Sequence, residues 1–195
     1  MNNKKEAYSI KIIIILLILF SCFMGCNSQN NSSKTKQEIS KEDKQLLSWS
    51  EGNGWMYDSK IDEMTSKNIK VSTIRSINAV DFGFPYNKKD NRGNLTIRKH
   101  PRYGTDIIFT IDKGQILCRF NGCSIPVRFN DEKPEIFSAH GSQDHSSNII
   151  FISSSKKFIE KIEKAKTVKI SVPFFKEGNH IFEFNTENYD KEYIK

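Results

Sequence analysis

The chain has 195 residues, with 30 Lys and Arg against 23 Asp and Glu, for a formal charge of +7. This length suits one domain, alone or with a tail. At 37% hydrophobic and 27% charged residues, the composition excludes a multi-span membrane protein, a collagen-like repeat and a wholly disordered chain.

Residues 1–25 have the layout of a secretory signal peptide. Three lysines precede nine unbroken apolar residues, Ile12 to Phe20. This run is too short to span a bilayer comfortably, because a transmembrane helix needs about 20 apolar residues. An uncleaved N-terminal anchor helix is the alternative. In both cases the bulk of the chain is exported.

The end of this segment, Phe23-Met24-Gly25-Cys26, resembles the lipobox at which bacterial lipoprotein signal peptides are cut. In that family the cysteine is acylated and becomes the new N-terminus, so the resemblance implies lipidation of Cys26. A second possible lipobox ends at Cys22, with Leu19 three positions before the cysteine. Cys26 is favoured because the chain turns polar only after it. The resemblance therefore implies a protein anchored by lipid to the cell envelope, on the outer membrane facing the periplasm in a Gram-negative cell.

Residues 26–48 are predicted to carry the lipidated cysteine and a flexible tether. Ser, Asn, Gln and Lys dominate this stretch, and its large apolar residues are Ile39, Leu46 and Leu47. Such a composition cannot bury enough surface to offset the entropy of ordering. A short amphipathic helix over the last ten residues is the alternative. The folded domain is predicted to cover residues 49–195.

Within this domain the apolar residues recur mostly with period two, which is typical of half-buried strands. The pattern predicts a mainly β, antiparallel, β-sandwich-like single domain. The predicted strands cover residues 69–73, 95–98, 107–111, 123–129, 168–174 and 182–184. Pro126 donates no ladder hydrogen bond, so its strand is expected at a sheet edge or at a bulge. The turn residues Glu177, Gly178 and Asn179 predict a closing hairpin between the last two strands.

One α-helix is predicted over about 154–166. Phe158, Ile159, Ile162 and Ala165 form an apolar stripe at helical spacing, and Ser153 to Ser155 offer N-caps. Lysines cover the opposite side. A helix laid over the sheet with solvated lysines is favoured over a helix lying on a membrane surface.

Cys118 and Cys123 are the remaining cysteines after the signal region, and an even count in an oxidising compartment favours a disulfide. A four-residue hairpin loop with Gly122 in the left-handed conformation would place them opposite each other on neighbouring strands. A two-residue Asn121-Gly122 turn would set them diagonally. A redox dithiol or half of a zinc site is the functional alternative, but no second cysteine pair completes a zinc site.

The segment from Ala139 to Ser147 contains two of the four histidines, Asp144 and three serines. A hydrolase would need a nucleophilic serine within hydrogen-bond reach of a histidine, and a carboxylate that orients the histidine. All three residue types occur here, but without a Gly-x-Ser-x-Gly elbow. A metal site would use His140, Asp144 and His145. A capped surface loop is favoured over both, so no catalytic residue, metal ligand or cofactor is predicted.

A basic, aromatic loop is predicted between two strands at residues 98–104. Its candidate ligand-binding residues are Arg98, Lys99, His100, Arg102 and Tyr103. The arginine fork suits phosphate, acidic glycan or a carboxylate-bearing partner. A solvated strand connection, with Gly104 in the turn, is the alternative. Nucleic acid is not expected as a partner, because few aromatic residues are interleaved with the basic ones. In addition, the domain from Trp49 onward has a formal net charge of only +4, from 23 basic and 19 acidic residues.

Several short motifs resemble a family of small exported proteins of bacteria and bacteriophages whose function is unassigned. The motifs are Phe84-Pro-Tyr86, Leu95 to Gly104, Gly114-Gln115 before Cys118, Val127-Arg-Phe129, Asp144 to Ser147 and Phe174 to Gly178. A weaker likeness is to VasI-type accessory proteins of type VI secretion, through Trp55, Asp62, Ile97-Arg98, 106–111 and 172–184. That likeness implies a β-rich fold; neither family supplies catalytic residues.

These features predict a lipid-anchored envelope protein that is a non-enzymatic binding or accessory module. Its expected partners are the membrane, through the N-terminal lipid, and an envelope protein or an anionic envelope component. Two alternatives remain open. One is a phage superinfection-exclusion lipoprotein that blocks a surface receptor or the uptake of DNA. The other is an envelope hydrolase that uses the segment His140 to Ser147.

Overall fold

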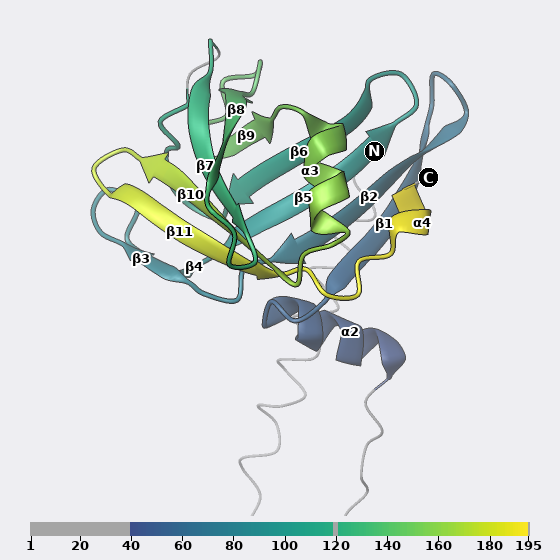
Figure 1. Ribbon diagram of the computed structural model, residues 1–195, viewed down its shortest axis with the longest axis horizontal. Coiled ribbons are helices and arrows are strands. Elements are labelled where there is room, and N and C mark those ends of the chain that lie inside the picture. The colour runs from purple at the N-terminus through teal and green to yellow at the C-terminus, as the bar shows by residue number, and fades with distance from the viewer. Residues whose placement is uncertain (1–39, 119–120, 195) are drawn as a thin grey trace, which may run out of the picture. The chain divides into compact units, whose positions relative to one another are not determined.

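The computed structural model describes residues 40–118 and 121–194 (Figure 1). The predicted signal peptide, Cys26 and the tether up to residue 39 lie outside the described residues. Three helices and eleven strands occur in the described part. In chain order they are α2 (Lys41–Ser50), β1 (Trp55–Asp62), β2 (Lys67–Arg75), β3 (Val80–Phe82), β4 (Lys88–Asn91), β5 (Gly93–His100), β6 (Gly104–Ile111), β7 (Cys123–Phe129), β8 (Glu135–Gly141), β9 (Ile149–Ile152), α3 (Ser155–Ile162), β10 (Thr167–Phe174), β11 (Gly178–Asn185) and α4 (Lys191–Ile194).

Nine strands form one antiparallel sheet in the order β1-β2-β5-β6-β9-β8-β7-β10-β11, and β3 and β4 form a second, two-stranded sheet. The prediction of a mainly β, antiparallel, sandwich-like domain is confirmed. The large sheet folds back on itself: β7, β10 and β11 cross β5 and β6 in Figure 1. The ring of Phe109 in β6 lies 5.1 Å from that of Phe182 in β11, so a central strand and an end strand of the sheet bury their inner faces against each other.

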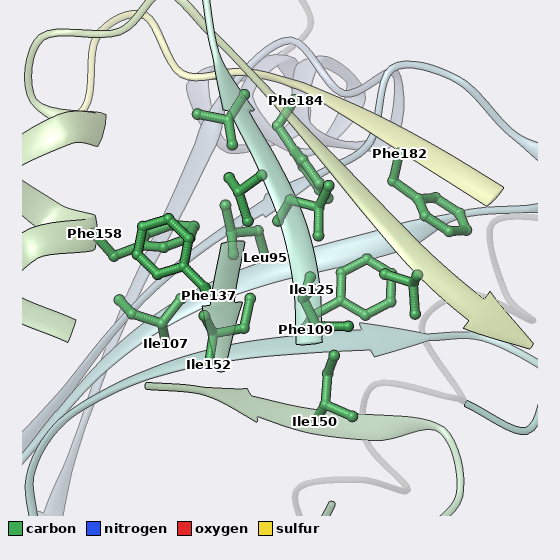
Figure 2. Packing of buried hydrophobic residues seen from close by; sticks show 14 of the residues in the cluster. Leu95, Ile107, Phe109, Ile125, Phe137, Ile150, Ile152, Phe158, Phe182 and Phe184 are labelled. Carbon is green, nitrogen blue, oxygen red and sulfur yellow. The ribbon is translucent and has the colours of Figure 1, made fainter. Parts of the chain in front are cut away.

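The core between these layers is built from alternate residues of nearly every strand (Figure 2). In β10, Val168, Ile170, Val172 and Phe174 are buried, as their period-two spacing predicted. The closing hairpin is also confirmed, because Phe174 pairs with Gly178 across a short turn. Burying apolar side chains at about 25 cal/mol per Å² makes this face the main source of stability.

The predicted helix packs over this core as α3, although it ends at Ile162 rather than near residue 166. Phe158 is fully buried, and its ring lies 5.4 Å from Phe129 and 5.2 Å from Phe137. Ser154 is the N-cap residue, but its side chain makes no hydrogen bond that caps the helix. The apolar stripe therefore faces the sheet and not a membrane.

Two local predictions are wrong. β7 is not an edge strand, because it lies between β8 and β10. Its ladder with β10 ends at Val127, so the missing N–H of Pro126 removes no hydrogen bond to β10. A helix, α2, occupies the last part of the predicted tether, with Ser40 accepting a hydrogen bond from the Asp43 backbone at 3.1 Å. This is the alternative that the sequence left open. Among the described residues, no helix has the length and apolarity needed to cross a membrane.

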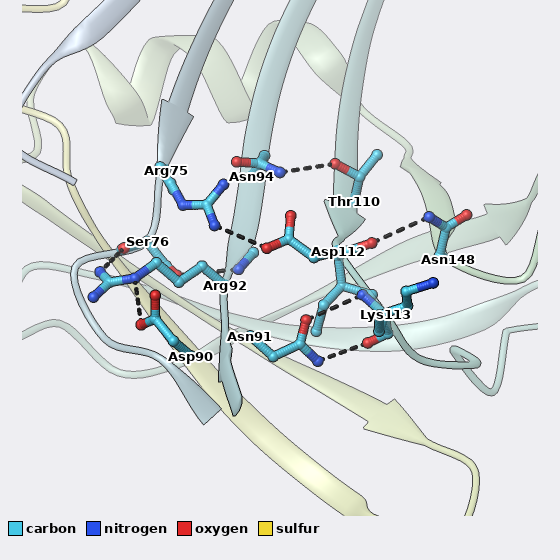
Figure 3. Close-up of polar contacts among 12 residues, drawn as sticks. Arg75, Ser76, Asp90, Asn91, Arg92, Asn94, Thr110, Asp112, Lys113 and Asn148 are labelled. Atoms are coloured by element: carbon cyan, nitrogen blue, oxygen red, sulfur yellow. Dashed lines mark hydrogen bonds and ion pairs between the residues drawn. The ribbon is translucent and has the colours of Figure 1, made fainter. Parts of the chain in front are cut away.

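The sheet is closed by the segment that follows β2. The Ile77 N–H donates to the Glu183 carbonyl at 2.8 Å. The Asn78 side chain donates to the Ile181 carbonyl and accepts from the Glu183 N–H, both at 2.8 Å. Arg92 braces this segment by donating to the carbonyls of Ser76 and Ile77, within the polar cluster of Figure 3. These contacts join the first half of the sheet to its last strand.

Gly93 lies where the two layers approach most closely. A Cβ atom there would lie 2.6 Å from Cε2 of Phe109 and 3.0 Å from Cδ1 of Phe182. We expect Gly93→Ala to lower the free energy of unfolding by about 1–3 kcal/mol, because both rings must shift within a packed core. Urea unfolding followed by circular dichroism measures this change.

Gly83→Ala is the matched control, since the nearest atom to its Cβ would be Oε1 of Glu177 at 3.8 Å. Equal stability of the two variants would contradict the close approach of β5 and β11.

Candidate functional site

One candidate site is a hollow of about 510 Å³ at one end of the sheet. We call it the disulfide hollow. It is lined by Gln115 to Cys118, Gly141, Ser142, His145 to Ser147 and Phe175. Its volume lies within the range of small-ligand sites, about 300–1,000 Å³. Three segments distant in sequence therefore meet at one concave surface.

One wall of the hollow is the connection between β6 and β7. The buried Asn91 side chain holds its start by donating to the Lys113 carbonyl at 2.7 Å and accepting from the Lys113 N–H at 3.1 Å (Figure 3). Further on, the Ile116 N–H donates to the Ser147 carbonyl at 2.7 Å, and the Leu117 N–H donates to the Pro173 carbonyl at 2.8 Å. This wall is therefore hydrogen-bonded to its neighbours at Lys113, Ile116 and Leu117.

Gly114 lets this connection pass close to the core. Its φ is +143°, and a Cβ would lie 2.8 Å from Cε2 of Phe82 and 3.2 Å from Cδ1 of Phe174. Both the backbone conformation and the space favour glycine at this position.

The disulfide between Cys118 and Cys123 closes the same wall. The sulfur atoms are 2.04 Å apart and the Cα atoms 5.1 Å apart. The pairing agrees with the prediction, and Gly122 has a positive φ of 107°. The predicted hairpin between neighbouring strands is wrong, however. Cys118 lies in the connection, outside the strands, while Cys123 begins β7. The bridge thus ties the wall of the hollow to the sheet.

The opposite wall is the loop after β8. The sequence predicted a loop from residue 139, but Ala139, His140 and Gly141 belong to β8. The loop itself is organised around Asp144, whose carboxylate accepts a hydrogen bond from the Ser146 N–H at 2.9 Å. This bond, together with the hydroxyls of Ser142 and Ser146, lowers the pKa of Asp144 to about 2. His145 adopts a positive φ of 60° at the rim of the hollow.

These residues do not form a catalytic triad. Among the described residues, no hydrogen bond joins the His145 imidazole to a serine hydroxyl or to Asp144. The carboxylate is used to cap the loop, so it does not orient a histidine as a hydrolase requires. His140 points elsewhere, with its ring stacked on Phe151 at 5.5 Å. No group of three His, Cys, Asp or Glu residues suited to a metal ion occurs in the described ranges.

The predicted basic loop is a tight hairpin. Arg98, Lys99 and His100 belong to β5, and His100 pairs with Gly104, so the loop proper is residues 101–103. The Arg98 guanidinium donates to Asp106 at 2.9 Å. Arg102 pairs with Asp62 at 3.0 Å, across to the β1–β2 hairpin. A carboxylate therefore matches each arginine, which reduces the attraction of this loop for an external anion.

The rest of that hairpin packs on itself. His100 is buried and its Nδ1 accepts the Arg102 N–H at 3.1 Å. The Tyr103 ring lies 4.5 Å from the His100 ring and remains 67% exposed. The five candidate ligand-binding residues thus lie together in space, at the end of β5 and in the turn that follows it.

Tertiary structure also joins two motifs that the sequence kept apart. On the solvent-facing side of the sheet, the Arg98 guanidinium lies 6.0 Å from the Phe151 ring, and His140 stacks on the same ring with an interplanar angle of 10°. Phe151 was not predicted as a site residue. Its strand is the four-residue apolar run of β9, which has no alternation to separate an inner from an outer face.

Comparisons with known proteins add no relative. No protein-family model, no curated protein and no solved structure matches the chain. The family likenesses drawn from short motifs stay predictions.

Asp144 should titrate far below an ordinary aspartate. Because its folded-state pKa is lowered from about 3.9 to about 2, its stabilising hydrogen bonds are fully present above about pH 4 and are lost as the pH falls through about 2. The Ser146 amide resonance, followed by NMR, should shift with a midpoint near pH 2. Asp144→Asn should remove this transition. A midpoint near pH 4 would contradict the capped loop.

Proposed function

We propose that the protein is a lipid-anchored component of the cell envelope that binds another envelope protein without catalysing a reaction. The disulfide hollow is the observation that carries the binding role. Its walls are tied down by the Cys118–Cys123 bridge and by backbone hydrogen bonds. A concave surface held rigid before binding loses little conformational entropy when a partner docks.

The lining of the hollow suits a protein partner. Leu117 and Phe175 are 50% and 41% exposed and lie at its edge. His145, Gln115 and the serines offer hydrogen-bonding groups beside them. Apolar anchors next to hydrogen-bonding groups are typical of protein interfaces.

Binding is favoured over hydrolysis because, in the part of the chain that the structure describes, no histidine contacts the hydroxyl of a nearby serine. A nucleophilic serine needs a base within hydrogen-bond reach, and the described contacts of His145 include no serine hydroxyl. The anchoring part of the proposal is supported by the pattern of residues 1–26 and by the presence of a disulfide, which is typical of exported proteins.

We expect Cys26→Ser to abolish lipid attachment when the full chain is expressed in a bacterial host. The wild-type chain should incorporate an alkyne-labelled fatty acid and fractionate with membranes. Cys26→Ser should incorporate none and accumulate as a longer precursor. Cys22→Ser is the matched control and should behave like the wild type. Normal labelling of Cys26→Ser would refute anchoring at this cysteine.

Site-specific photo-crosslinking in intact cells tests the binding role. A benzophenone amino acid at Leu117 should give one discrete adduct with another protein. The same probe at Ile136, which is 64% exposed on β8, should not give that adduct. Adding Phe175→Ser should reduce the adduct about ten-fold, since it removes an apolar anchor. Equal patterns at positions 117 and 136 would argue against a partner in the hollow.

A further inference from the structure

The strand β1 is an open edge of the large sheet. Among the described residues it pairs only with β2, in continuous register from Trp55↔Ile74 to Asp62↔Lys67. Proteins usually blunt such an edge with charged side chains, a proline, a bulge or a covering segment, because its free N–H and C=O groups can pair with another chain. The charges here, Asp58 and Lys60, are of opposite sign. This eight-residue strand contains no proline, and its register has no bulge.

The second half of the strand is uncovered on both faces. Residues 58 to 61 are all exposed, and Ile61 is 66% exposed. The start of the strand is different: Gln45 of α2 reaches the Trp55 carbonyl at 3.5 Å, and Trp55 is buried against Tyr189. Tyr57 is also engaged, because its ring lies 4.9 Å from that of Tyr193 and its hydroxyl accepts the Asp190 N–H. The exposed part of the edge is therefore residues 58–61.

We propose that this edge pairs with the same edge of a second copy of the chain, antiparallel, about a two-fold axis at Ser59. In that register Asp58 of each copy lies opposite Lys60 of the other, which places two ion pairs side by side. Ile61 lies opposite Tyr57, so the exposed isoleucine lies beside the aromatic pair that Tyr57 forms with Tyr193. Such an interface is isologous, as expected for a closed dimer.

Neighbouring registers lack this complementarity. Centring the pair on Asp58 places that aspartate opposite itself, and centring it on Lys60 places two lysines opposite each other and Asp58 opposite Asp62. Shifts of half a residue leave Asp58 opposite Ser59 or Ile61. Like charges placed directly opposite destabilise a strand pair, so charge selects the Ser59 register. The interface is a single strand pair, and association should accordingly depend on protein concentration.

Cysteine trapping tests this proposal on the full chain in bacterial cells, read on non-reducing gels. Ser59→Cys places a thiol on the two-fold axis, where opposed Cβ atoms come within about 4.5–5.5 Å and small adjustments allow a disulfide. It should give a covalent dimer. Ser138→Cys, exposed on the interior strand β8, is the matched control and should stay monomeric.

Charge reversal then tests the register in the Ser59→Cys background. Lys60→Asp should reduce the dimer about five-fold or more, because it creates two like-charge pairs. Asp58→Lys should do the same, and the double swap Asp58→Lys/Lys60→Asp should restore the dimer. Dimer formation by Ser138→Cys equal to that of Ser59→Cys would overturn the proposal. So would a failure of the double swap to rescue, or a Ser59→Cys adduct with a different protein.

This proposal and the proposed function fail independently. The edge lies on β1, whereas the disulfide hollow is built from residues 115–118, 141–147 and 175. A failure to detect the cross-linked adduct at Leu117 would refute the proposed function but would not affect the expected Ser59→Cys dimer.

Discussion

The closure of the large sheet on itself is the constraint on which the rest of the domain depends. A sheet of nine strands with one apolar face must cover that face, and here strands from its two halves cover each other. Ser76, directly after β2, is hydrogen-bonded to the first residue of β5. Its N–H donates to the Gly93 carbonyl at 2.8 Å, and its hydroxyl accepts the Gly93 N–H at 3.1 Å. Asn78 then pairs with β11. Because Gly93 has no side chain, Phe109 and Phe182 can meet beneath it.

Closure also determines where a binding surface can form. Once β5, β6 and β11 are packed, the connection from β6 to β7 must pass over the end of the sheet. Asn91, fully buried, satisfies the backbone of Lys113 at the start of this passage. The disulfide ties its far end to β7. The hollow is therefore a consequence of how the closed sheet is connected.

The same packing brings several lysines and arginines of the domain into ion pairs with carboxylates. On α3, Lys157 pairs with Glu135 at 2.7 Å, and Lys161 pairs with the same carboxylate, which lowers the pKa of Glu135. Lys166 lies 3.6 Å from Glu187. Arg98 pairs with Asp106 in its own hairpin, and Arg102 pairs with Asp62 at the end of β1. Most of these pairs are at least partly exposed, and such pairs are individually weak. They nevertheless place a carboxylate beside several of the cations of the described domain.

The sequence by itself determined the fold class, the closing hairpin, the packed helix and the cysteine pair, because these depend on local periodicity, turn residues and cysteine count. It did not predict β1, β8 or β9: β1 and β8 mix polar and apolar residues irregularly, and β9 is a short apolar run. Only tertiary structure decided that Pro126 lies inside the sheet, that Arg98 and His140 share Phe151, and that Cys118 meets Ser147 around one hollow. Strand order and closure decide these neighbours, and they arise from long-range pairing that no local pattern encodes.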